Sequence, residues 1–227
     1  MENWPRIPKT AMISDNQKHD QVLKEIAFVN QYNARIATNL RRAQDLIEFA
    51  ETCPRDQIKD DILRAAVVFL HATLEDFLRY IGARYIPSGS EDVLNKISLL
   101  GSSDVLHPEK FHLGKLAKHR DKKIDQLIAE SVEAYLDKRS FSNTTDISHL
   151  LDTVRVPNRV VEKLYPSLSE LMARRHEIVH RGDLKPTTNQ ERERDPEPID
   201  ASKVKEWYET VFNFVSSVAA CKLGTGV

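Results

Sequence analysis

Residues 56–85, DQIKDDILRAAVVFLHATLEDFLRYIGARY, include the longest apolar run of the chain, residues 65–70. Apolar residues fall on nearly every face of a helix drawn through this stretch, which predicts a central helix buried on several sides. Glu75 and Asp76 follow the run, and carboxylates inside so apolar a helix must face a polar cleft or a buried cation. Pairing with Arg79 at the surface is the alternative, and the sequence leaves both open.

The flanking segments repeat the helical spacing. Residues 17–50 carry apolar side chains every three or four positions without an intervening glycine or proline, and Pro54 closes this segment. Weaker helical patterns occupy residues 109–139 and 144–154, and Asp200 is expected to cap a last helix with one apolar face. Since no strand-like alternation appears, the sequence predicts an all-α fold.

The composition, the net charge, the cysteines and the N-terminus limit the class of protein that the chain can be. Charged residues make up 30% of the chain and hydrophobic ones 41%, a balance typical of a helix-rich globular protein, and the formal net charge is −1. Nucleic-acid binding would therefore depend on a local patch. Cys53 and Cys221 show no metal-ligand spacing and no disulfide framework. The N-terminus lacks the pattern of a signal peptide and residues 65–70 are too few to cross a bilayer, so we expect a cytoplasmic protein with no membrane contact.

The changes in pattern along the chain suggest its organisation. We expect an N-terminal arm over residues 1–15 and a single all-helical domain over residues 16–223, with an insertion at roughly residues 87–140. Residues 115–123 are basic and offer a phosphate-binding face, although a solvated helix face is the commoner meaning of such a pattern. Residues 185–198, KPTTNQERERDPEP, almost lack apolar side chains, which predicts an exposed, mobile loop after the helix that carries the motif described next.

Residues 167–183, SLSELMARRHEIVHRGD, combine a helical apolar stripe with many charged and titratable groups. Arg175 lies on the apolar stripe. Because a guanidinium keeps its charge, Arg175 requires a polar cleft or an acidic partner, for which Glu75 and Asp76 are the candidates. Gly182 is expected to end the helix.

His176 and His180 share a face of this helix, one turn apart. With Glu177 between them they spell the H-E-x-x-H pattern of a zinc metallohydrolase, in which two histidines bind the metal and the glutamate is the general base. A third ligand would have to come from Glu191, Glu193 or a residue further on, within or beyond the predicted loop. This requirement makes zinc chemistry the weaker interpretation of the stretch.

The stretch Arg175–His180 also has the form R-polar-x-x-x-H, which resembles the nuclease motif of the HEPN superfamily, with His176 at the polar position. The motif ends a helix late in an all-α chain, just before a glycine, and residues 72–79, ATLEDFLR, lie far upstream on a long apolar helix. This combination is similar to the RiboL-PSP branch of HEPN domains. The resemblance is clearest over residues 61–85 and 143–183.

The resemblance implies an HEPN-like helical bundle with additional helices, and a metal-independent ribonuclease that works as a homodimer without a cofactor. It implies Arg175 and His180 as catalytic residues of a composite dimer site that cleaves RNA to a 2′,3′-cyclic phosphate and a 5′-hydroxyl. A role as a toxin or antiviral defence effector, restrained by an inhibitory partner protein, would fit such an enzyme. We further predict supporting roles for His176, Glu75 and Asp76, and contacts to neighbouring phosphates from Arg174 and Arg181.

The side-chain chemistry agrees with this assignment. Histidine accepts and donates protons near neutral pH, as deprotonation of a 2′-hydroxyl and protonation of the leaving oxygen require. Arginine binds phosphate oxygens through a permanent fork of donors. One motif arginine and one motif histidine per chain are few for this reaction, which favours pairing of two chains. The alternative is a non-catalytic HEPN module that binds RNA, nucleotide or protein, with Arg175 as a buried structural charge.

Overall fold

The computed structural model describes residues 15–100, 113–184 and 196–223 of the chain. Apart from one isolated β-bridge between Leu184 and Pro196, every regular element in these ranges is a helix, which confirms the all-α prediction. The α-helices are α1 (Asp15–Thr52), α2 (Asp56–Tyr85), α3 (Glu91–Leu94), α4 (Ile124–Asp137), α5 (Thr144–Thr153), α6 (Tyr165–Arg181) and α7 (Ala201–Leu223). The 3-10 helices are η1 (Ile86–Ser88), η2 (Leu113–His119), η3 (Asn158–Val160) and η4 (Glu162–Leu164).

The chain forms two units, the first ending at Thr38 and the second beginning at Asn39. Of the first unit, the structure describes α1 from Asp15 onward. The rest of α1 and all later helices belong to the second unit, which holds the candidate site. Apart from Asp15, the predicted N-terminal arm lies outside the described residues.

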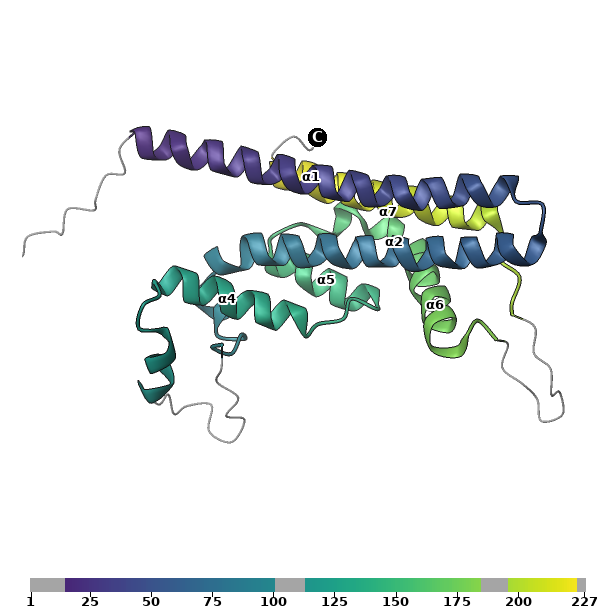
Figure 1. Ribbon diagram of the computed structural model, residues 1–227. Coiled ribbons are helices and arrows are strands. Elements are labelled where there is room, and N and C mark those ends of the chain that lie inside the picture. Colours follow the sequence, from purple (N-terminus) through teal and green to yellow (C-terminus); the bar gives the residue numbers. More distant parts are fainter. Residues whose placement is uncertain (1–14, 101–112, 185–195, 224–227) are drawn as a thin grey trace, which may run out of the picture. The chain divides into compact units, whose positions relative to one another are not determined.

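The helix α2 is central to the second unit and contacts α4, α6 and α7 (Figure 1). It begins and ends at the residues that the sequence predicts. Phe77 of α2 meets Phe214 of α7 edge to face, with ring centroids 6.3 Å apart. The helix α4 comes so close at Gly82 that a Cβ there would lie 2.9 Å from a methyl carbon of Leu136. Apolar side chains are therefore buried on several sides of α2, and such burial is the dominant favourable contribution to folding in general.

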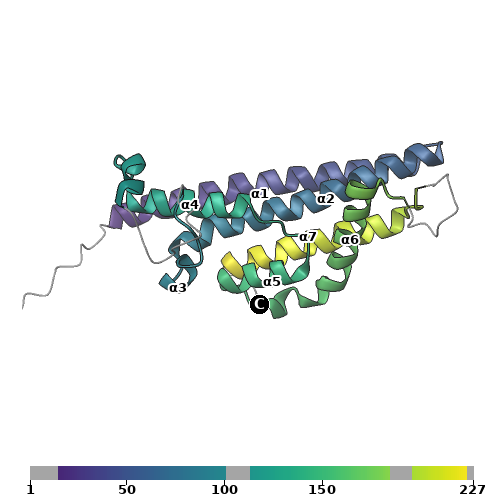
Figure 2. The ribbon, with the colours of Figure 1, turned by 90° about the horizontal axis from the view of Figure 1, so that it is seen from below.

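The helix α6 runs across α2 and α7 (Figures 1 and 2). Its apolar stripe is buried at Leu168, Leu171 and Met172. Gly182 ends the helix, as predicted, in a left-handed conformation (φ 61°) that glycine adopts without steric cost. The N–H of Asp183 then donates to the carbonyl of Glu177 at 3.0 Å, which closes the last turn of the helix.

A buried carboxylate fastens the end of α6 to the rest of the unit. The carboxylate of Asp183, which is 2% exposed, accepts hydrogen bonds from Arg64 Nε of α2 and Arg174 Nη2 of α6, each at 2.7 Å. Arg174 Nη1 lies 2.9 Å from the carboxylate of Glu197, which precedes α7. The N–H of Glu197 donates to the carbonyl of Asp183 at 2.8 Å. Asp183 thus joins three segments that are distant in the sequence.

The structure corrects one predicted helix and confirms one predicted cap. The helix expected over residues 109–139 is interrupted, because the backbone is extended at Lys123 (ψ 150°) and α4 begins only after it. The side chain of Asp200 accepts a hydrogen bond from the N–H of Ser202 at 3.0 Å, so it caps α7 as expected. Residues 185–195 of the predicted mobile loop lie outside the described residues. None of the described helices is long and apolar enough to cross a membrane.

Candidate functional site

An open cleft of about 370 Å³ lies between α2, the turn before α5, and α6. This volume is within the range of ligand-binding clefts. Most of the residues that line it are polar by type, namely His71, Ser142, Asn143, Thr144, Ser169, Arg175, His176 and Glu177. The cleft therefore joins the predicted motif helix to two segments far from it in the sequence.

Arg175 is half-buried on one wall of this cleft, and its Nε is buried with no hydrogen-bond partner among the described residues. Of the two surroundings that the sequence allowed, the structure shows the polar cleft. No ion pair to Arg175 occurs within the part of the chain that the structure describes. An arginine whose charge is not neutralised by a nearby carboxylate is available to an anionic ligand.

The two carboxylates predicted to support the site are not in the cleft lining. Glu75 Oε2 lies 3.4 Å from Nη1 of Arg79, and its Oε1 accepts a hydrogen bond from the N–H of Phe141 at 3.2 Å. The alternative pairing that the sequence left open is thus the one observed for Glu75, although its side chain is only 15% exposed. Asp76 is half-buried on the same helix, and neither carboxylate is among the described residues that line the cleft.

His71 of α2 lines the cleft and is 2% exposed, with Nε2 lacking a hydrogen-bond partner. Burial has the largest effect on the pKa of His71 and lowers it. The negative charge of Glu75 raises the pKa, whereas the positive charges of Arg175 and Arg79 lower it further. The ring is therefore neutral at pH 7. His71 could not be predicted as a site residue from the sequence, because a lone histidine in an apolar helix belongs to no motif.

The two motif histidines lie side by side on the surface of α6. Their ring centroids are 4.7 Å apart and the rings are tilted by 45°, which confirms that His176 and His180 share a face. Both are exposed, but only His176 is among the described residues that line the cleft. Val179, between them in sequence, is 46% exposed. In a single chain, therefore, His180 does not line the cleft itself but lies against His176, which does.

Arg174 and Arg181, predicted to contact neighbouring phosphates, are already engaged within the chain. Arg174 is held by Asp183 and Glu197 with its side chain only 14% exposed, which favours a structural role over contact with a substrate. Arg181 forms an exposed ion pair with Glu177 at 3.2 Å. Exposed pairs of this kind contribute little and open readily, so a phosphate contact by Arg181 stays a prediction.

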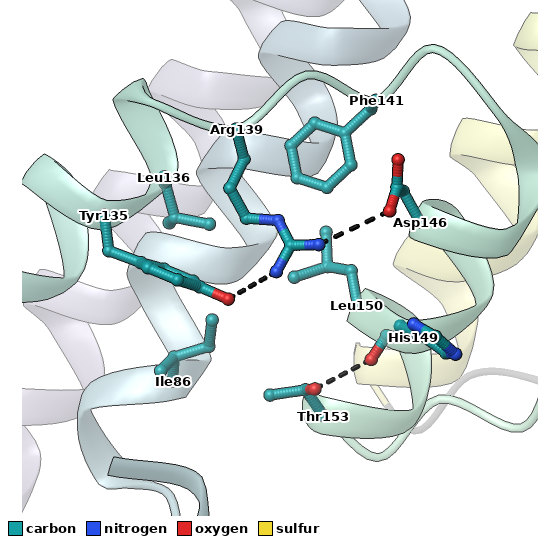
Figure 3. Close-up of a pocket in the computed structure, with 9 residues that line it drawn as sticks. All are labelled: Ile86, Tyr135, Leu136, Arg139, Phe141, Asp146, His149, Leu150 and Thr153. Carbon is teal, nitrogen blue, oxygen red and sulfur yellow. Dashed lines mark hydrogen bonds and ion pairs between the residues drawn. The ribbon is translucent and has the colours of Figure 1, made fainter. Parts of the chain in front are cut away.

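Hydrogen bonds of neighbouring residues hold the cleft wall formed by residues 142–144 in place. Asn143 caps α5 through a hydrogen bond from the N–H of Asp146 at 2.8 Å. Figure 3 shows Arg139 reaching between Tyr135 and Asp146, at 3.4 Å from the latter, over a second cavity of about 50 Å³. Since this arginine is paired and the cavity has room for little more than a water molecule or two, we interpret it as a packing gap beside the anchored wall.

Comparison with known protein families shows which family the chain belongs to. A model of the RiboL-PSP-HEPN family matches residues 33–221, most of the chain and all of the candidate site. The chain belongs to the RiboL-PSP-HEPN family. No curated protein and no solved structure gives a match. The family assignment agrees with the resemblance drawn from the motif at Arg175–His180.

A zinc site in this HEPN domain would need a third ligand beside His176 and His180. Among the described residues, no three histidine, cysteine, aspartate or glutamate side chains are grouped so that they could hold a metal ion. The predicted candidates Glu191 and Glu193 lie outside those residues.

The basic segment of the HEPN domain is apart from the cleft. It falls in η2 and the turn that follows, and Lys122 pairs with Glu130 of α4. None of its described side chains lines the cleft. The solvated-face interpretation of residues 115–123 is therefore favoured over a phosphate-binding role at this site.

Proposed function

We propose that this HEPN protein is a metal-independent endoribonuclease. The observation that carries the proposal is the guanidinium of Arg175, which lies without an ion pair among the described residues on the wall of an open, polar cleft. Maintaining an unpaired, half-buried charge is unfavourable for folding, which is expected where the charge serves a ligand. A phosphodiester supplies both the negative charge and the planar pair of oxygens that a guanidinium binds well.

In the proposed reaction, Arg175 holds the scissile phosphate and stabilises the charge that develops on it. His180 exchanges protons with the reacting oxygens. The ribose 2′-oxygen forms a bond to phosphorus after losing its proton to a base, and the bond from phosphorus to the 5′-oxygen breaks as that oxygen gains a proton. The products are a 2′,3′-cyclic phosphate and a 5′-hydroxyl, and neither water nor a metal ion is consumed.

A homodimer supplies the groups that one chain lacks. His180 is exposed and is not part of the cleft lining, so a second copy that packs on this face of α6 would add its own arginine and histidine to a composite site. Val179, which is 46% exposed beside the histidines, would be buried in such an interface. A toxin or antiviral effector held inactive by a partner protein is the biological role that we propose for this enzyme.

The separation of His180 from the cleft also favours a second candidate. A non-catalytic HEPN module would bind RNA or nucleotide through Arg175 alone and would have no need for a proton-transferring histidine beside it. Arg175→Lys keeps the charge but loses the forked donors, so either function would be weakened. Only the nuclease would also depend on His180.

The test is cleavage of a fluorescent mixed-sequence RNA by the full chain in excess EDTA. We expect cleavage by the parent protein and a loss of at least about 100-fold in both His180→Ala and Arg175→Lys, as when a transition-state donor is removed. His149→Ala and Arg159→Lys are matched controls, because both residues are exposed and neither lines the cleft. RNA binding without cleavage would support the binding module instead, and activity that requires added zinc would reinstate the H-E-x-x-H interpretation.

A further inference from the structure

The ring of His71 presents an unpaired polar atom beside the cleft. The side chain is 2% exposed, lines the cleft with Arg175, and its Nε2 makes no hydrogen bond. Most buried polar atoms in folded proteins have partners, so an exception calls for an explanation. A partner supplied by a ligand is one such explanation, because the unpaired atom belongs to a residue of the cleft wall.

The hydrogen bond of the other ring nitrogen decides whether Nε2 is a donor or an acceptor. His71 forms a hydrogen bond with the backbone of Phe141 that favours the protonated ring, so the ring is the donor in it. Since Nε2 has no partner among the described residues, we assign this hydrogen to Nδ1, facing the backbone of Phe141. The N–H of Phe141 in turn donates to Glu75, one turn further along α2, at 3.2 Å. Burial keeps the ring neutral, and a neutral ring with its hydrogen on Nδ1 has Nε2 as an acceptor.

Within the described parts of the chain, the cleft therefore combines an acceptor and a cation that both lack a partner. A ligand that satisfies both must offer a hydrogen-bond donor close to a negative charge. In a ribonucleotide chain the 2′-hydroxyl is such a donor, and it lies next to the 3′-phosphate. Because Nε2 is shielded from water in the unbound chain, a hydroxyl reaches it only when the neighbouring side chains move apart on binding.

We propose that His71 is a specificity-determining residue whose Nε2 accepts a hydrogen bond from a ribose 2′-hydroxyl while Arg175 holds the adjoining phosphate. DNA lacks the donor and would leave Nε2 unpaired, so the cleft selects RNA at the binding step. The inference rests on the proposed function only in taking RNA as the ligand. It requires binding and does not require cleavage.

The first experiment measures binding of one pentanucleotide sequence with four sugars: 2′-hydroxyl, 2′-amino, 2′-deoxy and 2′-fluoro. The full chain carries His180→Ala to prevent turnover, and fluorescence anisotropy in EDTA gives each dissociation constant. The hydroxyl and amino sugars are donors and should bind at least about tenfold more tightly than the other two, because a site built to pair a hydroxyl discriminates against ligands without one. Equal affinity across the four sugars, or no binding of RNA, would overturn the proposal.

The second experiment changes the acceptor. His71→Phe keeps a ring of similar size in the buried position but has no nitrogen, so RNA affinity should fall to that of the deoxy ligand while deoxy affinity stays the same. His71→Gln places an amide oxygen near the former Nε2 and should restore part of the preference. Retention of the full preference in His71→Phe would contradict the proposal, as would a preference that follows base identity. Far-ultraviolet circular dichroism checks that both variants fold; should they not, the four-sugar comparison in the parent background decides alone.

The two proposals fail in different ways. A sugar preference without cleavage would leave the role of His71 standing and remove the nuclease. Cleavage of RNA by the parent protein, together with equal binding of all four sugars, would remove the role of His71 and leave the nuclease.

Discussion

Replacing Asp183 by asparagine should destabilise the second unit by about 3 kcal/mol, although the only change is one carboxylate oxygen replaced by an NH2 group. Asp183 is the shared partner of Arg64 and Arg174, whose side chains are 12% and 14% exposed. Removing one partner of a buried ion pair costs about 3–5 kcal/mol. Asparagine retains the shape and tolerates the left-handed conformation at this position (φ 62°), so backbone strain does not add to the loss.

The remaining contacts of the two arginines reduce the expected loss below the upper end of that range. Arg64 keeps Asp61 at 3.1 Å, and Arg174 keeps the carboxylate of Glu197 at 2.9 Å. We therefore expect about 2–4 kcal/mol, or a fall in the midpoint of thermal unfolding of about 6–12 °C for the central value in a chain of this size.

Urea unfolding followed by circular dichroism measures this change in the free energy of unfolding. Glu177→Gln is the matched control, because it removes an exposed ion pair to Arg181 on the same helix and should cost less than about 0.5 kcal/mol. A loss of less than about 1 kcal/mol in Asp183→Asn would refute the argument that this carboxylate holds α6 in place.

Three further predictions concern the same helix and cleft. Gly182→Ala should cost about 1 kcal/mol in urea unfolding, because a Cβ is disfavoured at φ 61°; an unchanged midpoint would contradict this. Burial lowers the pKa of His71 from 6.5, so the unfolded chain binds the proton more readily and the stability of the parent should fall as the pH drops below about 6.5. His71→Phe should lack this part of the pH dependence, and identical profiles would argue against a neutral buried ring. Val179→Asp should shift a homodimer toward monomer in sedimentation velocity and lower RNA cleavage, whereas an unaltered dimer would exclude this face of α6 as the interface.

The sequence predicted the helices whose signals are local. The bounds of α2 were found because Pro54 and the polar residues after it mark the start, and the loop signals after Tyr85 mark the end. The end of α6 at Gly182 was found because glycine at that position has a local conformational reason. The motif at its end also predicted the family, which the comparison then confirmed.

The surroundings of the site could not be predicted because they depend on contacts between distant segments. Asp183 meets Arg64 across 119 positions of sequence, and no local pattern distinguishes that aspartate from an ordinary helix-end charge. The same absence of a local signal explains why the sequence predicts a phosphate contact for Arg174 and gives no sign of its pairing with Asp183 and Glu197. His71 became a candidate only when its burial, its neighbour Phe141 and its place in the cleft were known.

Analysis of the RNA ends by mass spectrometry tests the central proposal most directly. A defined RNA of one sequence is incubated with the full chain in excess EDTA, and the fragments are weighed. Attack by the 2′-hydroxyl at a site containing Arg175 and His180 predicts fragments that end in 2′,3′-cyclic phosphate and begin with 5′-hydroxyl, and none with Arg175→Lys. Intact RNA, or fragments that carry 5′-phosphate and appear only with added metal, would contradict the proposed mechanism.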